Sequence, residues 1–75
     1  MNACVLIRTS HGKFDEVVNS LRNLKGVKKI FSTLGRYDAV ADVEVSNIDE
    51  LDKLVLKMGN FVGIVFTETL PEIRQ

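Results

Sequence analysis

The chain has 75 residues, and its ten basic and ten acidic side chains give a formal net charge of zero. This length predicts one domain over residues 1–75. One cysteine and one histidine exclude an internal disulfide and a cysteine-rich metal site, so we expect no metal and no cofactor. The zero net charge argues against direct nucleic-acid binding, because neutralisation of phosphates supplies most non-specific affinity.

The longest apolar run, residues 3–7, is too short to cross a bilayer, and no signal peptide is recognisable, so we expect no membrane association. A single reduced cysteine fits a cytoplasmic protein. A domain of roughly this size buries only about 60% of its unfolded surface and gains stability from disulfides, metals or partner subunits. Since the first two are excluded, the composition predicts oligomerisation.

The first half of the chain predicts a strand, a helix and a second strand. Residues 3–9 begin with this continuous apolar run, which is typical of a central strand covered on both faces, and Cys4 within it is expected to be an inert core thiol. Residues 27–34 mix apolar and polar side chains and predict a partly exposed strand. Residues 13–25 predict an amphipathic helix, because apolar residues recur there at helical spacing: Phe14, Val17, Val18, Leu21 and Leu24.

The second half repeats this order after a turn over residues 35–38. Residues 39–45 alternate between apolar and polar positions, which predicts a strand. Ser46 and Asp49 fit a capping box, so a helix is expected to follow, and apolar residues recur there at helical spacing: Ile48, Leu51, Leu54, Val55 and Met58. Residues 61–70 are rich in aromatic and β-branched residues and predict the last strand.

This βαββαβ order indicates an α+β, ferredoxin-like fold, with a four-stranded antiparallel sheet and two helices on one of its faces. The other face is left open. On residues 39–45, the side opposite the small apolar residues carries Val40, Asp42 and Glu44. Arg8 is expected to pair with one of these two carboxylates if it shares their face. A mixed polar and apolar face suits a protein–protein contact or a small ligand.

A longer pattern runs through this turn and its following strand. Residues 35–43 combine a glycine, an aromatic residue and an aspartate that leads into an apolar strand, and Gly63, Thr67 and Thr69 follow later. In this order they resemble the effector-binding module of the leucine-responsive regulator/AsnC (Lrp/AsnC, feast/famine) family. The resemblance covers nearly the whole chain. It implies dimers of the α/β-barrel type formed through the sheets, rings of dimers, and an amino acid or similar molecule bound between subunits.

Members of that family usually carry an N-terminal helix-turn-helix domain, for which this chain has no room before its first strand. The resemblance therefore implies a stand-alone module without a DNA-binding domain. Effector sensing and assembly remain as its tasks, with full-length Lrp/AsnC regulators as candidate partners.

The candidate ligand-binding residues match the family pattern or carry suitable polar atoms: Gly35, Tyr37, Asp38, Asp42, Thr67 and Thr69. Amide groups of a glycine turn and threonine hydroxyls can donate hydrogen bonds to a carboxylate, while Asp38 or Asp42 can accept one from an ammonium group. Each residue also has a structural interpretation. Asp38 can cap its own turn, Tyr37 can anchor it, and Gly35 can supply a positive φ.

No serine or cysteine nucleophile has a base near it in the sequence, so no catalytic residue is predicted and an enzyme is not expected. The leading hypothesis is a self-assembling module that senses a small molecule. One alternative is a ligand-free assembly adaptor for full-length family regulators. The other, a small dimeric ferredoxin-like enzyme, is disfavoured by the single histidine and the short chain.

Overall fold

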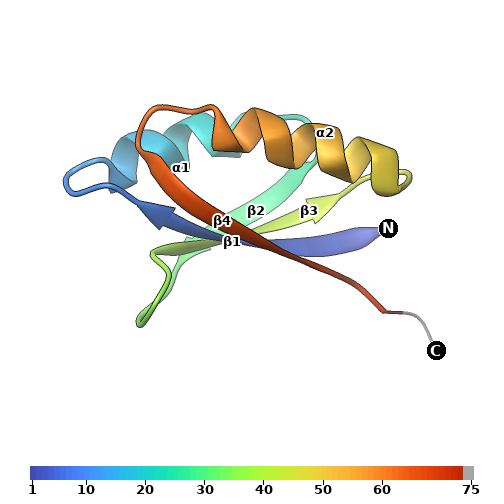
Figure 1. The fold of residues 1–75 in the computed structure, drawn as a ribbon, viewed down its shortest axis with the longest axis horizontal. Helices are drawn as coiled ribbons and strands as arrows, with labels where there is room; N and C mark the ends of the chain where they lie inside the picture. The colour runs from blue at the N-terminus through green and yellow to red at the C-terminus, as the bar shows by residue number, and fades with distance from the viewer. Residues whose placement is uncertain (74–75) are drawn as a thin grey trace.

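The structure is a computed structural model that describes residues 1–73. Its strands form one antiparallel sheet in the order β2-β3-β1-β4, and both helices cover the same face of it (Figure 1). The predicted ferredoxin-like fold is confirmed. No helix among these residues is long and apolar enough to cross a membrane. The elements are β1 (Asn2–Thr9), α1 (Phe14–Arg22), β2 (Val27–Ser32), β3 (Ala39–Glu44), α2 (Ile48–Gly59) and β4 (Ile64–Pro71).

The core lies between the helices and the sheet. Each helix turns one apolar stripe inward, as the helical spacing predicts, and alternate residues of β1 and β3 meet these stripes. α1 ends at Arg22, before the predicted end at residue 25, because the Leu24 amide donates to the Leu21 carbonyl (3.0 Å) in a tighter turn. The largest fully buried side chains of the core are Val5, Ile7, Val17, Leu21, Val43, Leu51 and Met58.

The N-terminal cap of α2 lies one residue later than predicted. Asn47, not Ser46, is the N-cap, and its side chain accepts a hydrogen bond from the Glu50 amide (2.9 Å). The Glu50 carboxylate in turn accepts one from the Ser46 amide (3.4 Å). Asparagine and serine are equally good N-caps. The predicted pairing of Ser46 with Asp49 was therefore wrong.

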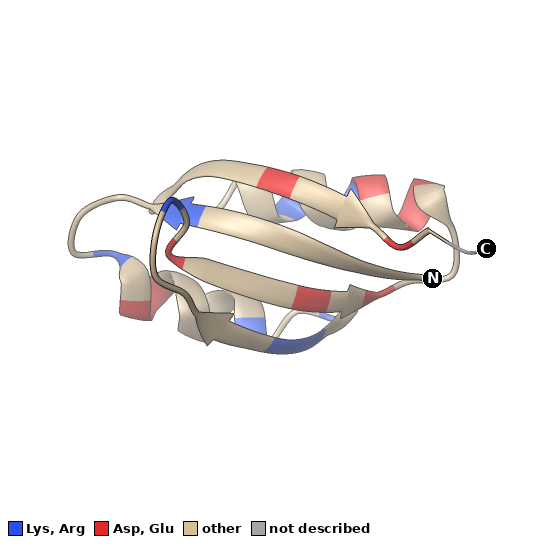
Figure 2. Cartoon of the chain, turned by 90° about the horizontal axis from the view of Figure 1, so that it is seen from below, with Lys and Arg blue, Asp and Glu red and all other residues tan. Residues whose placement is uncertain are grey.

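The sheet face away from the helices is not covered within the chain. We call this surface the open face. Figure 2 looks onto it and shows acidic segments on β3 and β4 and basic segments on β1 and β2. Three of its aromatic and aliphatic side chains are about half exposed: Phe31 (47%), Phe66 (51%) and Leu70 (49%). By strand register the open face holds Asn2, Cys4, Leu6, Arg8, Lys29, Phe31, Val40, Asp42, Glu44, Phe66, Glu68 and Leu70.

Two sequence-based expectations about β1 are therefore wrong for the single chain. β1 is a central strand, but only one of its faces is covered. Cys4 lies on the open face and is exposed, whereas a core thiol was expected. An apolar run on a central strand requires burial of both faces, but it does not say whether the same chain supplies the cover.

Candidate functional site

The turn between β2 and β3 extends beyond the sheet on the side away from the helices (Figure 1). We call residues 33–38 the β2–β3 turn. Its base is closed by the Thr33 amide, which donates to the Asp38 carbonyl (3.0 Å), and by the Thr33 hydroxyl, which donates to the Tyr37 carbonyl (2.8 Å). Gly35 has a φ of +109°, the positive value that the sequence predicts. Within the described chain, the amides of residues 34–37 donate no hydrogen bond.

Asp38 ties the β2–β3 turn to the end of β1. Its Oδ2 accepts hydrogen bonds from the Thr9 amide (2.7 Å) and the Thr9 hydroxyl (3.2 Å), and its own amide donates to the Ile7 carbonyl (2.8 Å). Bonds to a carboxylate are stronger than those between neutral groups. Asp38 therefore caps a neighbouring strand rather than its own turn. Its Oδ1 accepts no hydrogen bond within residues 1–73.

Arg8 provides a second anchor from β1. Its Nε (3.1 Å) and Nη2 (2.8 Å) both donate to the main-chain carbonyl of Arg36. Arg8 shares the open face with Asp42, but it forms none of the ion pairs found in the described chain. The acceptor is a main-chain atom 28 residues away, so the sequence carries no signal for this contact.

Glu44, the other carboxylate considered for Arg8, pairs instead with Lys28 on the neighbouring strand. Their side chains are 3.0 Å apart at the surface. The hydrogen bond between them raises the pKa of Lys28 and lowers the pKa of Glu44. Because both groups are exposed, this pair adds little to stability.

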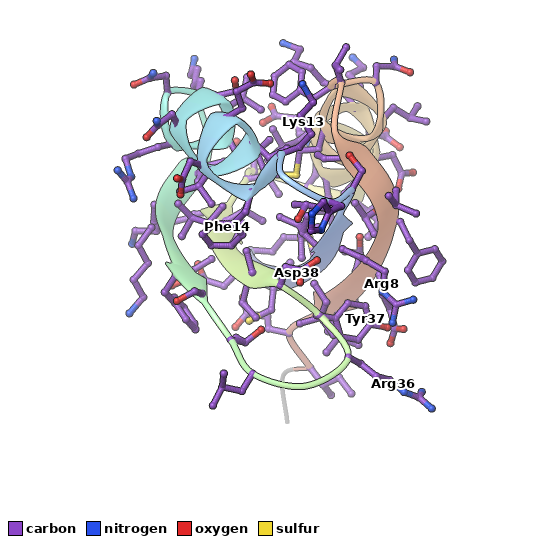
Figure 3. The ribbon with its side chains drawn as sticks, turned by 90° about the vertical axis from the view of Figure 1, so that its left-hand side faces the viewer. Arg8, Lys13, Phe14, Arg36, Tyr37 and Asp38 are labelled. Carbon is purple, nitrogen blue, oxygen red and sulfur yellow. The ribbon has the colours of Figure 1, made fainter. Side chains whose placement is uncertain are left out.

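Tyr37 connects the β2–β3 turn to β4. Its hydroxyl donates to the Glu68 carboxylate (2.7 Å), and its ring stacks on Phe66 with 6.4 Å between the centroids. The hydrogen bond to Glu68 raises the pKa of Tyr37. Figure 3 shows Arg8, Arg36 and Tyr37 at this end of the molecule, with Asp38 lying closer to the sheet. Three side chains thus hold the turn: those of Asp38 and Arg8 connect it to β1, and that of Tyr37 connects it to β4.

Three of the six residues predicted for the site come together in the β2–β3 turn, namely Gly35, Tyr37 and Asp38. Asp42 does not, because it lies further along β3 on the open face, opposite Cys4 and Lys29.

Thr67 and Thr69 also lie apart from the turn. They stand opposite Ile7 and Val5 of β1, whose side chains are buried under the helices, so both threonines point to the helix-covered side. Glu68 between them points to the open face and reaches Tyr37. The sequence pattern drew attention to the threonines, whereas the contact with the turn is made by the residue between them.

Among residues 1–73, no three His, Cys, Asp or Glu side chains are grouped so that they could hold a metal ion. The single histidine, His11, is exposed in the loop after β1.

Substitution of Arg8 by methionine should loosen the β2–β3 turn, because the turn loses both hydrogen bonds from the guanidinium. Bonds to charged groups contribute about 1.5–3 kcal/mol, so local opening should become at least about tenfold easier. Hydrogen exchange of the Thr33 and Asp38 amides, measured by NMR, reports this opening. Arg36→Met is the matched control, since it removes the same charge but keeps the carbonyl that Arg8 binds. Equal exchange rates in both variants would contradict the anchoring role.

Comparison with known proteins agrees with this architecture. The Lrp/AsnC ligand binding domain matches residues 2–75. The HTH-type transcriptional regulator FL11 of Pyrococcus abyssi is 30% identical over 70 residues, and that of Pyrococcus horikoshii is 29% identical over 70 residues. These matches cover 93% of this chain but 46% of each regulator. The chain thus spans about half the length of these curated relatives.

Solved structures of similar proteins also agree with this architecture. TTHA0845 from Thermus thermophilus superposes with a TM-score of 0.93 at 32% identity, covering 99% of this chain and 94% of that one. The hypothetical protein PHS023 from Pyrococcus horikoshii gives 0.89 at 29% identity, with 99% and 90% covered. E. coli AsnC gives 0.87 at 23% identity over 99% of this chain and 54% of AsnC, which shows a shared fold. The chain belongs to the Lrp/AsnC ligand binding domain family.

Proposed function

We propose that this protein is a regulatory module that senses an amino acid, or a closely related small molecule, and assembles with further copies of itself. Membership of a ligand-binding domain family supports the sensing role. The Pyrococcus relatives are named as transcriptional regulators, which supports a regulatory rather than a catalytic task.

The β2–β3 turn is the proposed ligand site, and its free amides are the observation that carries the proposal. Residues 34–37 offer consecutive N–H groups without a partner in the described chain, and such groups can bind a carboxylate. Gly35 lets the main chain approach a ligand closely. The free Oδ1 of Asp38 can accept a hydrogen bond from an ammonium group. A zwitterion carries both a carboxylate and an ammonium group, and both bonds would be charge-assisted.

The remaining predicted residues have less direct parts in this proposal. Asp42 lies on the open face, where it can meet a second subunit. Thr67 and Thr69 pair with Ile7 and Val5 of β1, and Glu68 between them accepts the hydrogen bond from Tyr37.

Self-association is proposed to occur through the open face, giving a face-to-face dimer. This face combines half-exposed aromatic and aliphatic side chains with scattered charges, and burial of such apolar surface favours association. A stable interface of this kind should bury more than about 1,000 Å² in total. Rings of such dimers, and mixed assemblies with full-length family regulators, are extensions of the same proposal.

A thermal-shift screen of the twenty amino acids tests the sensing function. A ligand that binds only the folded protein stabilises it by about 2.7 kcal/mol at a hundredfold excess over Kd. For a domain of this size the midpoint should rise on the order of 10 °C. Asp38→Asn should reduce this response, because the charge opposite the ammonium group is lost, whereas Asp42→Asn removes the same charge outside the turn and should respond like the wild type.

A screen in which no amino acid shifts the midpoint at millimolar concentration would overturn the sensing function. If such a protein still assembled with a full-length family regulator, the adaptor hypothesis would replace it.

A further inference from the structure

The tip of the β2–β3 turn presents an apolar and a cationic side chain next to each other. Leu34 is fully exposed, and the neighbouring Arg36 side chain makes no salt bridge within residues 1–73. They flank Gly35 at the end of a turn that extends past the open face (Figure 1). Isolated exposed leucines are common on protein surfaces. This one matters because a complementary surface exists elsewhere on the molecule.

That surface is a groove between α2 and β4, with a volume of about 400 Å³. We call it the α2–β4 groove. It is lined mainly by apolar side chains, among them Ile48, Val55, Leu56 and Pro71, and its one charged lining residue is Asp52. Ile48 and Leu56 are more than half exposed. The groove is therefore apolar with an acidic edge, and the turn tip is apolar with a basic edge.

We propose that the α2–β4 groove receives the β2–β3 turn of a second copy, with Leu34 entering the groove and Arg36 lying beside Asp52. Opposite charges at the two edges favour this orientation and disfavour the reverse. The turn extends on the open-face side, and the groove lies along β4, an edge strand of the sheet, on its helix-covered side.

This inference rests on the proposed self-association and names one contact that would hold two copies together.

Analytical ultracentrifugation over a range of protein concentrations tests the contact. Leu34→Ser should weaken self-association at least about tenfold, because the groove loses its apolar occupant. Val62→Ser is the matched control, since Val62 is also highly exposed (80%) but lies in the loop before β4, outside both surfaces. Val62→Ser should associate like the wild type.

A charge exchange tests the orientation. Arg36→Glu and Asp52→Lys should each weaken association, and the double variant should regain most of it, because the pair is restored with reversed signs. Association of Leu34→Ser as tight as that of the wild type, or a double variant no better than the single ones, would overturn the proposed contact while the wild type still assembles. A wild type that stays monomeric would overturn both this contact and the proposed self-association.

Discussion

Replacing Phe66 by aspartate is expected to convert the proposed dimer into folded monomers of 8.4 kDa. Phe66 lies on the open face opposite Arg8 and is half exposed in the single chain. In a face-to-face dimer its ring becomes buried, and truncation of a buried aromatic anchor costs about 2 kcal/mol or more. An unpaired carboxylate in the same place adds the cost of removing a charge from water. The fold itself should survive, because the ring is not part of the core.

Light scattering on the eluting peak gives the mass of each species directly. The single cysteine adds a second readout, since Cys4 lies on the open face and is exposed in the single chain. Its thiol should react slowly with a disulfide reagent in the assembled wild type and rapidly in the Phe66→Asp variant. Val62→Asp places the same charge on an exposed apolar residue away from the open face and should stay assembled. Dimers of unchanged stability in Phe66→Asp would exclude the open face as the interface.

Replacing Gly63 by valine is expected to cause the largest loss of stability among single substitutions outside the core. Gly63 has a φ of +100°, and an added Cβ would lie 2.9 Å from both Lys13 Cβ and Val17 Cγ2. The left-handed backbone conformation costs about 1–2 kcal/mol for an L-residue. Overpacking against α1 adds about 1–3 kcal/mol. The neighbourhood has little freedom to move, because the Gly63 carbonyl accepts a hydrogen bond from the Ser10 amide (2.8 Å).

Domains of this size have a free energy of unfolding of about 4–11 kcal/mol in total, so this substitution should remove a large part of it. Urea denaturation at a fixed protein concentration measures the loss. Gly12→Val is the control, because Gly12 also has a positive φ (+79°) but an added Cβ would meet nothing within 4 Å. It should show the backbone cost alone. Equal losses of unfolding free energy in the two variants would mean that α1 shifts to make room for the added side chain.

Most of the fold followed from periodicity in the sequence. Alternation predicted β3, and apolar spacing predicted both helices, because burial against one layer leaves a period in the chain. The same logic failed for β1. Its unbroken apolar run predicted cover on both faces, yet the second face is open in the single chain. Periodicity records that a face needs cover, not which molecule provides it.

The candidate site was predictable only where its residues are adjacent in the chain. Gly35, Tyr37 and Asp38 were found because one turn holds them. The anchors from Thr9 and Arg8 were not, because they depend on strand register and end on atoms far away in sequence. The contact of the last strand with the turn was not predicted, because the sequence pattern pointed to Thr67 and Thr69, and Glu68 between them faces the other side of the strand.

Binding of the ligand at the β2–β3 turn is the central claim, and the amide resonances of residues 34–37 report on it most directly. These N–H groups donate no hydrogen bond within the described chain, so a bound carboxylate would become their acceptor in place of solvent. Hydrogen bonding changes the amide shift and slows exchange with water. The measurement is an NMR titration of ¹⁵N-labelled protein with the amino acid that raises the thermal midpoint.

The largest saturable changes in amide chemical shift are expected at Leu34, Gly35, Arg36 and Tyr37. Amide exchange there should slow as the ligand is added. The Asp38→Asn variant should need more ligand to reach the same shifts. Saturable shifts confined to another part of the molecule, with the turn amides unchanged, would contradict the proposed site.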